Sequence, residues 1–172
     1  VHLDTVAWNA MLSAYNDKEQ GDKTLSIYEI MQELFTYPDH LTFVIALQAC
    51  GIIGEKQQAF QKGETYFLDI GRALHLDIKR KGYASHVPIA NTLVSMYGKC
   101  GCLEDARIVF DTASQDDVIS WNSMISMYSY NGCVTQALNC FYQMYQNGVI
   151  PNRVTYISIL SICMNTSSKR NN

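Results

Sequence analysis

Two stretches of this sequence are nearly the same, although they lie far apart in the chain. The eight residues that begin at Trp8 and the eight that begin at Trp121 are identical at five positions. The shift along the chain from Trp8 to Trp121, which we call the long offset, also takes Pro38 to Pro151. A register kept over this distance indicates an internal repeat, in which similar pieces of chain pack on one another.

A second, shorter offset lies within the first. It takes Asn91 to Asn122 and Ala106 to Ala137. The repeating unit is therefore about 31 to 35 residues long, which is the size of one helical hairpin in a solenoid. The long offset then contains three units of unequal length.

Each unit is predicted to contain a helix, a short turn and a second helix. From Val118 onward, apolar residues recur at helical spacing until Gly132, and a second apolar stripe follows until Gly148 and Pro151. A single hairpin of this kind cannot bury its apolar face alone, so neighbouring hairpins must stack. We expect most of the tryptophan, methionine and tyrosine side chains to pack in the shared core.

The composition agrees with a substantial core and excludes several classes of protein. Apolar residues make up 48% of the 172 residues and charged residues only 17%. No apolar run is long enough for a membrane span, and the first residues do not resemble a signal or transit peptide. Because the pattern is already under way at both ends, we expect the sequence to be a piece of a longer protein.

Catalytic and metal-binding patterns are missing from the sequence. The six cysteines include no CxxC pair and lie away from the histidines, which favours free thiols over disulfides or a zinc site. We find no glycine-rich phosphate loop and no acyl-transfer motif. We therefore expect no enzymatic activity, no cofactor and no small-molecule substrate.

The repeat resembles the pentatricopeptide repeat family. Its units open on Trp-Asn, as at Trp121, and end on Pro-Asp or Pro-Asn, as at Pro151. The order of standard, long and short units is similar to the P-L-S class of land-plant organellar proteins. The segment 91–111 is close to the short-unit consensus of that class.

This resemblance implies an all-α fold, a right-handed α-solenoid (superhelix) of stacked helix-turn-helix hairpins. It divides the chain into a standard unit at 5–39, a long unit at 40–86, a short unit at 87–117, a standard unit at 118–152 and a truncated long unit at 153–172. An insertion near 55–66 is expected to form a polar loop between the two helices of the long unit. The tail is expected to fray after Cys163.

The resemblance also implies binding of single-stranded RNA, with about one base per unit. Sequence-specific RNA recognition uses unstacked bases, which are hydrogen-bonded on their Watson–Crick edges. The family reads bases with two residues per unit, and these positions here hold Asn9 with Asp39, Asn91 with Asp117, and Asn122 with Asn152. In the family's code asparagine with aspartate reads uracil, and asparagine with asparagine reads cytosine. Because Val44 and His86 in the long unit match no known pair, the predicted RNA core is U-n-U-C.

Further RNA contacts follow from the same resemblance. The side chains expected to sandwich the bases are Val6, Leu41, Pro88, Ile119 and Val154. Lys99 is expected to contact a phosphate. The formal charge of −3 supplies little attraction for RNA, so we expect micromolar or weaker affinity. A simpler interpretation of the asparagines and aspartates is helix capping without a ligand.

Two classes of function remain open from the sequence. The alternative to RNA binding is a tetratricopeptide-like scaffold that binds proteins, because its repeats have a similar length. The Trp-Asn start and the unequal units favour RNA binding in the editing, processing or stability of transcripts. By resemblance the protein is expected in mitochondria or chloroplasts, with editing-factor proteins as partners of the longer parent protein and no membrane partner.

Overall fold

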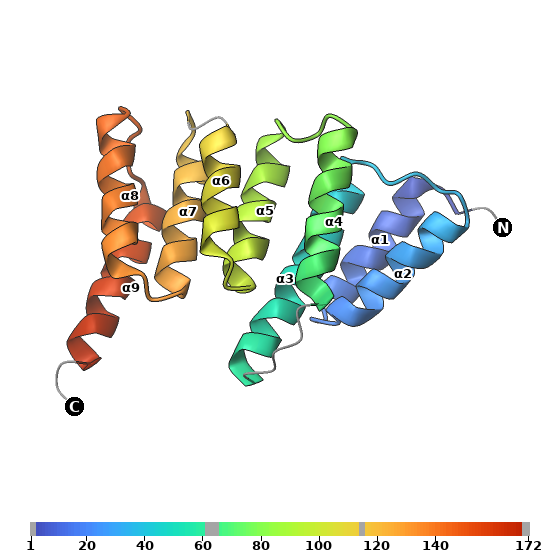
Figure 1. The fold of residues 1–172 in the computed structure, drawn as a ribbon, viewed down its shortest axis with the longest axis horizontal. Coiled ribbons are helices and arrows are strands. Elements are labelled where there is room, and N and C mark those ends of the chain that lie inside the picture. Colours follow the sequence, from blue (N-terminus) through green and yellow to red (C-terminus); the bar gives the residue numbers. More distant parts are fainter. Residues whose placement is uncertain (1–2, 61–65, 114–115, 170–172) are drawn as a thin grey trace.

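The chain folds into a row of helical hairpins (Figure 1). The computed structural model describes residues 3–60, 66–113 and 116–169, and the regular structure in these ranges is entirely helical. The hairpins are α1 (Thr5–Asn16) with α2 (Gly21–Glu33), α3 (His40–Phe60) with α4 (Tyr66–Arg80), α5 (Val87–Lys99) with α6 (Leu103–Thr112), and α7 (Val118–Tyr130) with α8 (Val134–Gln146). The last described helix is α9 (Arg153–Lys169). The predicted all-α class is confirmed, and no helix in these ranges is long and apolar enough to cross a membrane.

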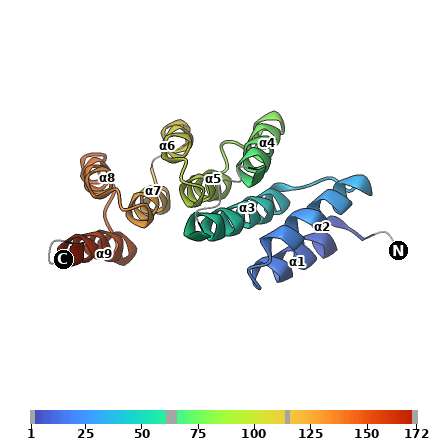
Figure 2. The same cartoon turned by 60° about the horizontal axis from the view of Figure 1, so that its bottom comes forward.

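The helices lie in two layers (Figure 2). The first helices α1, α3, α5, α7 and α9 each contact the next one and form a continuous layer. Each of α2, α4, α6 and α8 packs on its own partner and on the first helix of the following hairpin. The first helices therefore present one shared surface, on which equivalent positions of successive hairpins recur.

Three of the turns within hairpins, those between α1 and α2, α5 and α6, and α7 and α8, share one backbone geometry. Gly101, between α5 and α6, has a φ of 77°, and Gly132, between α7 and α8, has a φ of 69°. Glu19 takes this place between α1 and α2 with a φ of 54°. A side chain in this left-handed region is strained, because its Cβ crowds the backbone. The turn geometry is thus kept even where glycine is absent.

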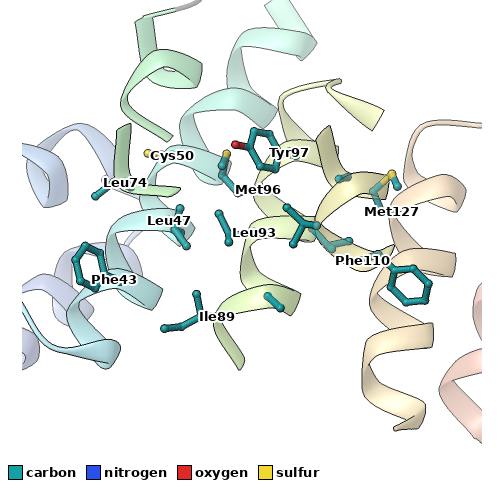
Figure 3. Close-up of a cluster of buried hydrophobic side chains, with 14 of the residues drawn as sticks. Phe43, Leu47, Cys50, Leu74, Ile89, Leu93, Met96, Tyr97, Phe110 and Met127 are labelled. Atoms are coloured by element: carbon teal, nitrogen blue, oxygen red, sulfur yellow. The ribbon is translucent and has the colours of Figure 1, made fainter. Parts of the chain in front are cut away.

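The core is continuous from hairpin to hairpin. Leu47 of α3, Leu74 of α4 and Leu93 of α5 are all buried and meet between these helices (Figure 3). Between α6 and α7, the rings of Phe110 and Trp121 pack edge to face, with 4.9 Å between their centroids. Since the buried side chains of each hairpin contact those of the next, the hairpins stabilise one another as expected for a repeat protein.

Two local expectations from the sequence are wrong. Residues 55–60 were expected to begin a polar loop, but they continue α3 as helix up to Phe60. They contain no proline or glycine, and glutamate, lysine, glutamine and alanine favour helix. Residues 61–65 of the expected loop lie outside the described residues. The tail was expected to fray after Cys163, but α9 continues to Lys169, again through a segment without a helix breaker.

Candidate functional site

Asn9 lies in a polar network that joins two neighbouring hairpins. Asn9 is the fifth residue of α1 and is only 5% exposed. Its Nδ2 donates to Oδ1 of Asp39 at 3.1 Å, and its Oδ1 accepts the Thr42 hydroxyl at 2.7 Å. Asp39 Oδ1 also accepts the Thr42 backbone N–H at 2.8 Å and so caps the start of α3. The predicted reading pair is therefore in direct contact.

The same network recurs around Asn122, the fifth residue of α7. Asn122 is 8% exposed, and its Nδ2 donates to Oδ1 of Asn152 at 3.1 Å. The Thr155 hydroxyl donates to Asn122 Oδ1 at 2.6 Å. Asn152 Oδ1 accepts the Val154 backbone N–H at 3.0 Å at the start of α9. The Nδ2 of Asn152 has no hydrogen-bond partner within the described ranges, and this side chain is exposed.

The predicted pair of Asn91 and Asp117 is arranged differently. Asp117 Oδ1 accepts the backbone N–H groups of Ile119 and Ser120 at 2.7 and 3.0 Å. Its Oδ2 accepts the Ser120 hydroxyl at 2.7 Å. Asn91 is partly exposed, and its side chain forms no hydrogen bond with any described residue. The structure thus joins two of the three predicted pairs by a direct hydrogen bond, Asn9 with Asp39 and Asn122 with Asn152.

The long unit offers no polar pair at the equivalent place. Val44 is partly buried against the core. His86 is exposed and lies in a cluster of rings, 5.4 Å from Tyr83 and 6.2 Å from His40 between centroids. An aliphatic side chain at the reading position has no atom that could hydrogen-bond a base.

The residues predicted to stack on bases occupy the same position in successive first helices, and their side chains are exposed. Each is the second residue of a first helix, one turn before the reading position, and they are Val6, Leu41, Pro88, Ile119 and Val154. Ile119 is 62% exposed and Val154 is 51% exposed. Residues three apart on a helix lie on the same face, so each apolar side chain lies beside a reading position.

A groove brings several predicted residues together. It has a volume of about 600 Å³, and α5, α7 and α9 form its walls. Its lining includes Ile119, Asn122, Asn152, Val154 and Lys99. We call it the C-terminal groove. Its two most exposed aliphatic side chains flank the Asn122–Asn152 pair, which is the arrangement expected for a planar ring held between apolar contacts.

A smaller groove of about 330 Å³ lies among α1, α3 and α5, and Lys99 lines both grooves. We call it the N-terminal groove. The Lys99 ammonium forms an ion pair with Oε2 of Glu55 at 2.9 Å. The predicted phosphate contact therefore already has a carboxylate partner, which the sequence analysis did not anticipate.

Asp39 and Asn152 offer different hydrogen-bonding groups at equivalent places. Burial raises the pKa of Asp39, but hydrogen bonds from the Thr42 backbone, the Thr42 hydroxyl and Asn9 outweigh this effect, and the pKa lies below its ordinary value. Asp39 is therefore a carboxylate at neutral pH and can only accept hydrogen bonds. Asn152 keeps an amide NH₂ that can donate.

Three buried hydroxyl residues that hydrogen-bond the capping side chains were not predicted from the sequence. These are the third residues of three first helices, namely Thr42, Ser120 and Thr155. All three are buried. The internal repeat carried a signal for two of them, because the long offset takes Thr42 to Thr155. A hydroxyl three residues after an aspartate or asparagine at a helix start is typical of a capping network.

Comparison with known proteins identifies the repeat. A model described as the PPR repeat family matches residues 116–165, and a model of the PPR repeat matches residues 6–34 and 89–116. A chloroplastic pentatricopeptide repeat-containing protein of Arabidopsis thaliana is 38% identical over 155 residues, which are 90% of this chain and 27% of that protein. A mitochondrial one from the same plant is 33% identical over 158 residues, 92% of this chain and 16% of that protein. The chain thus spans about a quarter or less of these relatives.

Solved structures share the fold. The crystal structure of the pentatricopeptide repeat protein PPR10 from maize has a TM-score of 0.73 and 23% identity, over 96% of this chain and 23% of that chain. PPR10 in complex with an 18-nt psaJ RNA element has a TM-score of 0.75 and 20% identity, over 97% of this chain and 24% of that one. The predicted α-solenoid of stacked hairpins is confirmed by this likeness.

Proposed function

Because this chain belongs to the pentatricopeptide repeat family, we propose that it binds single-stranded RNA along its layer of first helices. One observation carries the proposal. In the C-terminal groove, the Asn122–Asn152 pair lies between the exposed side chains of Ile119 and Val154. This places hydrogen-bonding groups beside apolar surface, the combination that holds an unstacked base by its edge and its faces.

The donor and acceptor groups favour different bases at the two joined pairs. Uracil carries an N–H at its N3 position, which needs an acceptor, and the Asp39 carboxylate supplies one. Cytosine carries a bare N3, which needs a donor, and the Nδ2 of Asn152 supplies one. This chemistry supports uracil at the Asn9–Asp39 step and cytosine at the Asn122–Asn152 step.

The remaining steps complete a U-n-U-C core. Asn91 with Asp117 is assigned to the second uracil, since Asn91 is partly exposed and its amide is available. The Val44 and His86 step is assigned no base. The unequal units support membership of the P-L-S class. The PPR proteins named chloroplastic or mitochondrial among the relatives support a role in organellar RNA processing, within a longer parent protein.

Affinity is expected to be modest. Of the described residues that line the two grooves, Lys99 is the only cation, and it is paired with Glu55. Phosphate contacts supply much of the affinity of most nucleic-acid-binding proteins. Apolar contacts and hydrogen bonds to three bases must then provide most of the binding, which favours a micromolar or weaker dissociation constant.

The test is a titration of this chain with labelled RNA. One strand carries U-n-U-C and the control strand carries the same bases in scrambled order, at two salt concentrations. We expect tighter binding of the first strand at both concentrations. Equal binding of both strands would contradict base reading. If neither strand binds, a protein-binding scaffold becomes the better interpretation.

A matched pair of variants locates the binding surface. Ile119→Ala removes an apolar contact in the C-terminal groove, whereas Ile108→Ala removes a side chain of similar exposure, 58%, from α6 in the other layer. We expect Ile119→Ala to weaken RNA binding about tenfold, which corresponds to about 1.4 kcal/mol, and Ile108→Ala to leave it unchanged. Equal effects would place the RNA elsewhere.

A further inference from the structure

Lys99 occupies a central place on the surface assigned to RNA. It is the last residue of α5 and lines both the C-terminal and the N-terminal groove. Its side chain is 35% exposed. The only carboxylate among the described lining residues of the two grooves is Asp17. Lys99 is therefore the group that would attract a phosphate to this surface.

The position of Glu55 is set by a close approach of two helices. A Cβ on Gly54 would lie 2.6 Å from the Sγ of Cys100, and one on Gly51 would lie 3.2 Å from Cδ of Lys99. The two glycines thus let α3 lie against the end of α5. Glu55 follows Gly54 directly, in the part of α3 that belongs to the inserted segment, and its carboxylate reaches the Lys99 ammonium at 2.9 Å.

Glu55 also acts on the rim of the C-terminal groove. Burial raises the pKa of the Tyr130 hydroxyl, and the charge of Glu55 adds to this effect. Tyr130 lines that groove. Lys56, the residue after Glu55, points instead toward Glu19, whose backbone carbonyl and carboxylate it contacts. Glu55 therefore brings a negative charge to the point where RNA phosphate would bind.

We propose that Glu55 competes with RNA phosphate for Lys99 and so lowers the affinity of this surface for RNA. The inference rests on the proposed function. An ion pair whose partners are 35% and 45% exposed is weak, because water screens it. A phosphate can therefore displace Glu55, and the insertion acts as an internal competitor. Base contacts must then supply a larger share of the binding free energy. The RNA sequence therefore has a larger influence on which RNA is bound.

The experiment compares charge-neutralising variants of the whole chain. Glu55→Gln removes the competitor, and Glu29→Gln removes the same charge from an exposed site on α2, in the other layer. RNA dissociation constants are measured over a range of salt concentrations. We expect Glu55→Gln to bind about three- to tenfold more tightly than the original chain at low salt. Its affinity should also fall more steeply with salt, by about 0.7 in the logarithmic slope, as for one more phosphate contact.

A double-mutant cycle tests that the effect passes through Lys99. In a Lys99→Gln background, Glu55→Gln should change the affinity no more than Glu29→Gln does. The inference is overturned if Glu55→Gln and Glu29→Gln have the same effect, or if the gain persists without Lys99. Urea unfolding of each variant separates a change in affinity from a change in stability.

The same titrations separate a failure of the Glu55 proposal from a failure of base reading. Phosphate contacts carry no sequence information, so the gain in Glu55→Gln should occur on U-n-U-C RNA and on scrambled RNA alike. A gain on both strands without a preference between them supports the competitor and contradicts base reading. If U-n-U-C RNA is preferred but Glu55→Gln binds RNA no more tightly, the proposed role of Glu55 alone is overturned. No binding by any variant overturns both.

Discussion

Asn122 donates its amide to Asn152 across the boundary between two hairpins, over 3.1 Å. Asn152 also caps α9, so one side chain ends one unit, starts the next helix and faces the C-terminal groove. Capping is therefore compatible with the proposed base reading. The capping bonds occupy Oδ1 of Asn152, and this leaves its NH₂ group for a ligand. The capping of α9 and the proposed recognition of RNA thus depend on the same side chain.

Thr155→Val is expected to destabilise the chain by about 1 to 3 kcal/mol. The change keeps the shape of a buried side chain but removes the hydroxyl that donates to Asn122 Oδ1 at 2.6 Å and accepts the Asn152 N–H at 3.0 Å. Urea unfolding measures the loss. Thr112→Val is the control, since this exposed hydroxyl bonds to carbonyls of its own helix, and a change within about 0.5 kcal/mol is expected. Similar losses in both variants would contradict the role of the network.

Asn152→Asp is expected to change the preferred base at the last step from cytosine to uracil. The change replaces the free NH₂ with an acceptor oxygen and keeps the oxygen that caps α9. Binding to U-n-U-U and U-n-U-C RNA measures the preference. Asp39→Asn should make the opposite change at the first step, from uracil to cytosine. If neither variant changes the preferred base, Asn152 and Asp39 do not read bases.

Acidification is expected to destabilise the chain partly through Asp39. The pKa of this carboxyl is lower in the folded chain than its ordinary value of 3.8. Such a group stabilises the fold above its unfolded-state pKa, and that contribution is lost as the pH falls through the folded-state pKa. The free energy of unfolding should therefore fall less steeply below pH 3.8 in Asp39→Asn than in the original chain. Urea unfolding of both proteins as a function of pH measures the difference, and equal slopes would contradict this role of Asp39.

Gly54→Ala is expected to be less stable than Gly51→Ala by about 1 to 3 kcal/mol. Both changes add the same methyl group to α3 and gain similar helix propensity. At Gly54 the new Cβ would meet Cys100 Sγ and the Lys99 carbonyl, whereas at Gly51 its nearest neighbour is the flexible Lys99 side chain. Thermal unfolding compares the two. Adding Cys100→Ala to Gly54→Ala should recover part of the loss, and its failure to do so would argue against the contact.

Phe35→Gly is expected to stabilise the chain by about 1 kcal/mol. Phe35 follows α2 with a φ of 55° and is 86% exposed, so its side chain gains little from packing. The long offset takes it to Gly148, which has a φ of 74°. Phe35→Ala is the control, because alanine keeps the strain and should change stability little. Equal stability of the two variants would show that backbone strain is not the cause.

Much of the fold and part of the candidate site could be predicted from the sequence. The repeat offsets located the hairpins, because each copy of a unit carries the same helix and turn signals. The resemblance to the pentatricopeptide repeat family added the second and fifth positions of each first helix, where Ile119 is exposed and Asn122 meets its predicted partner. The long offset even paired Thr42 with Thr155, although their role was not assigned.

The period, most of the helix positions and the side chains available at each step follow from local sequence pattern. Which side chains meet depends on tertiary packing. Asn9 and Asn122 bind across hairpin boundaries, whereas Asn91 forms no such bond with a described residue, and Lys99 meets Glu55. These contacts depend on how closely successive helices approach. That distance is set by packing at places such as Gly54, between residues far apart in the chain.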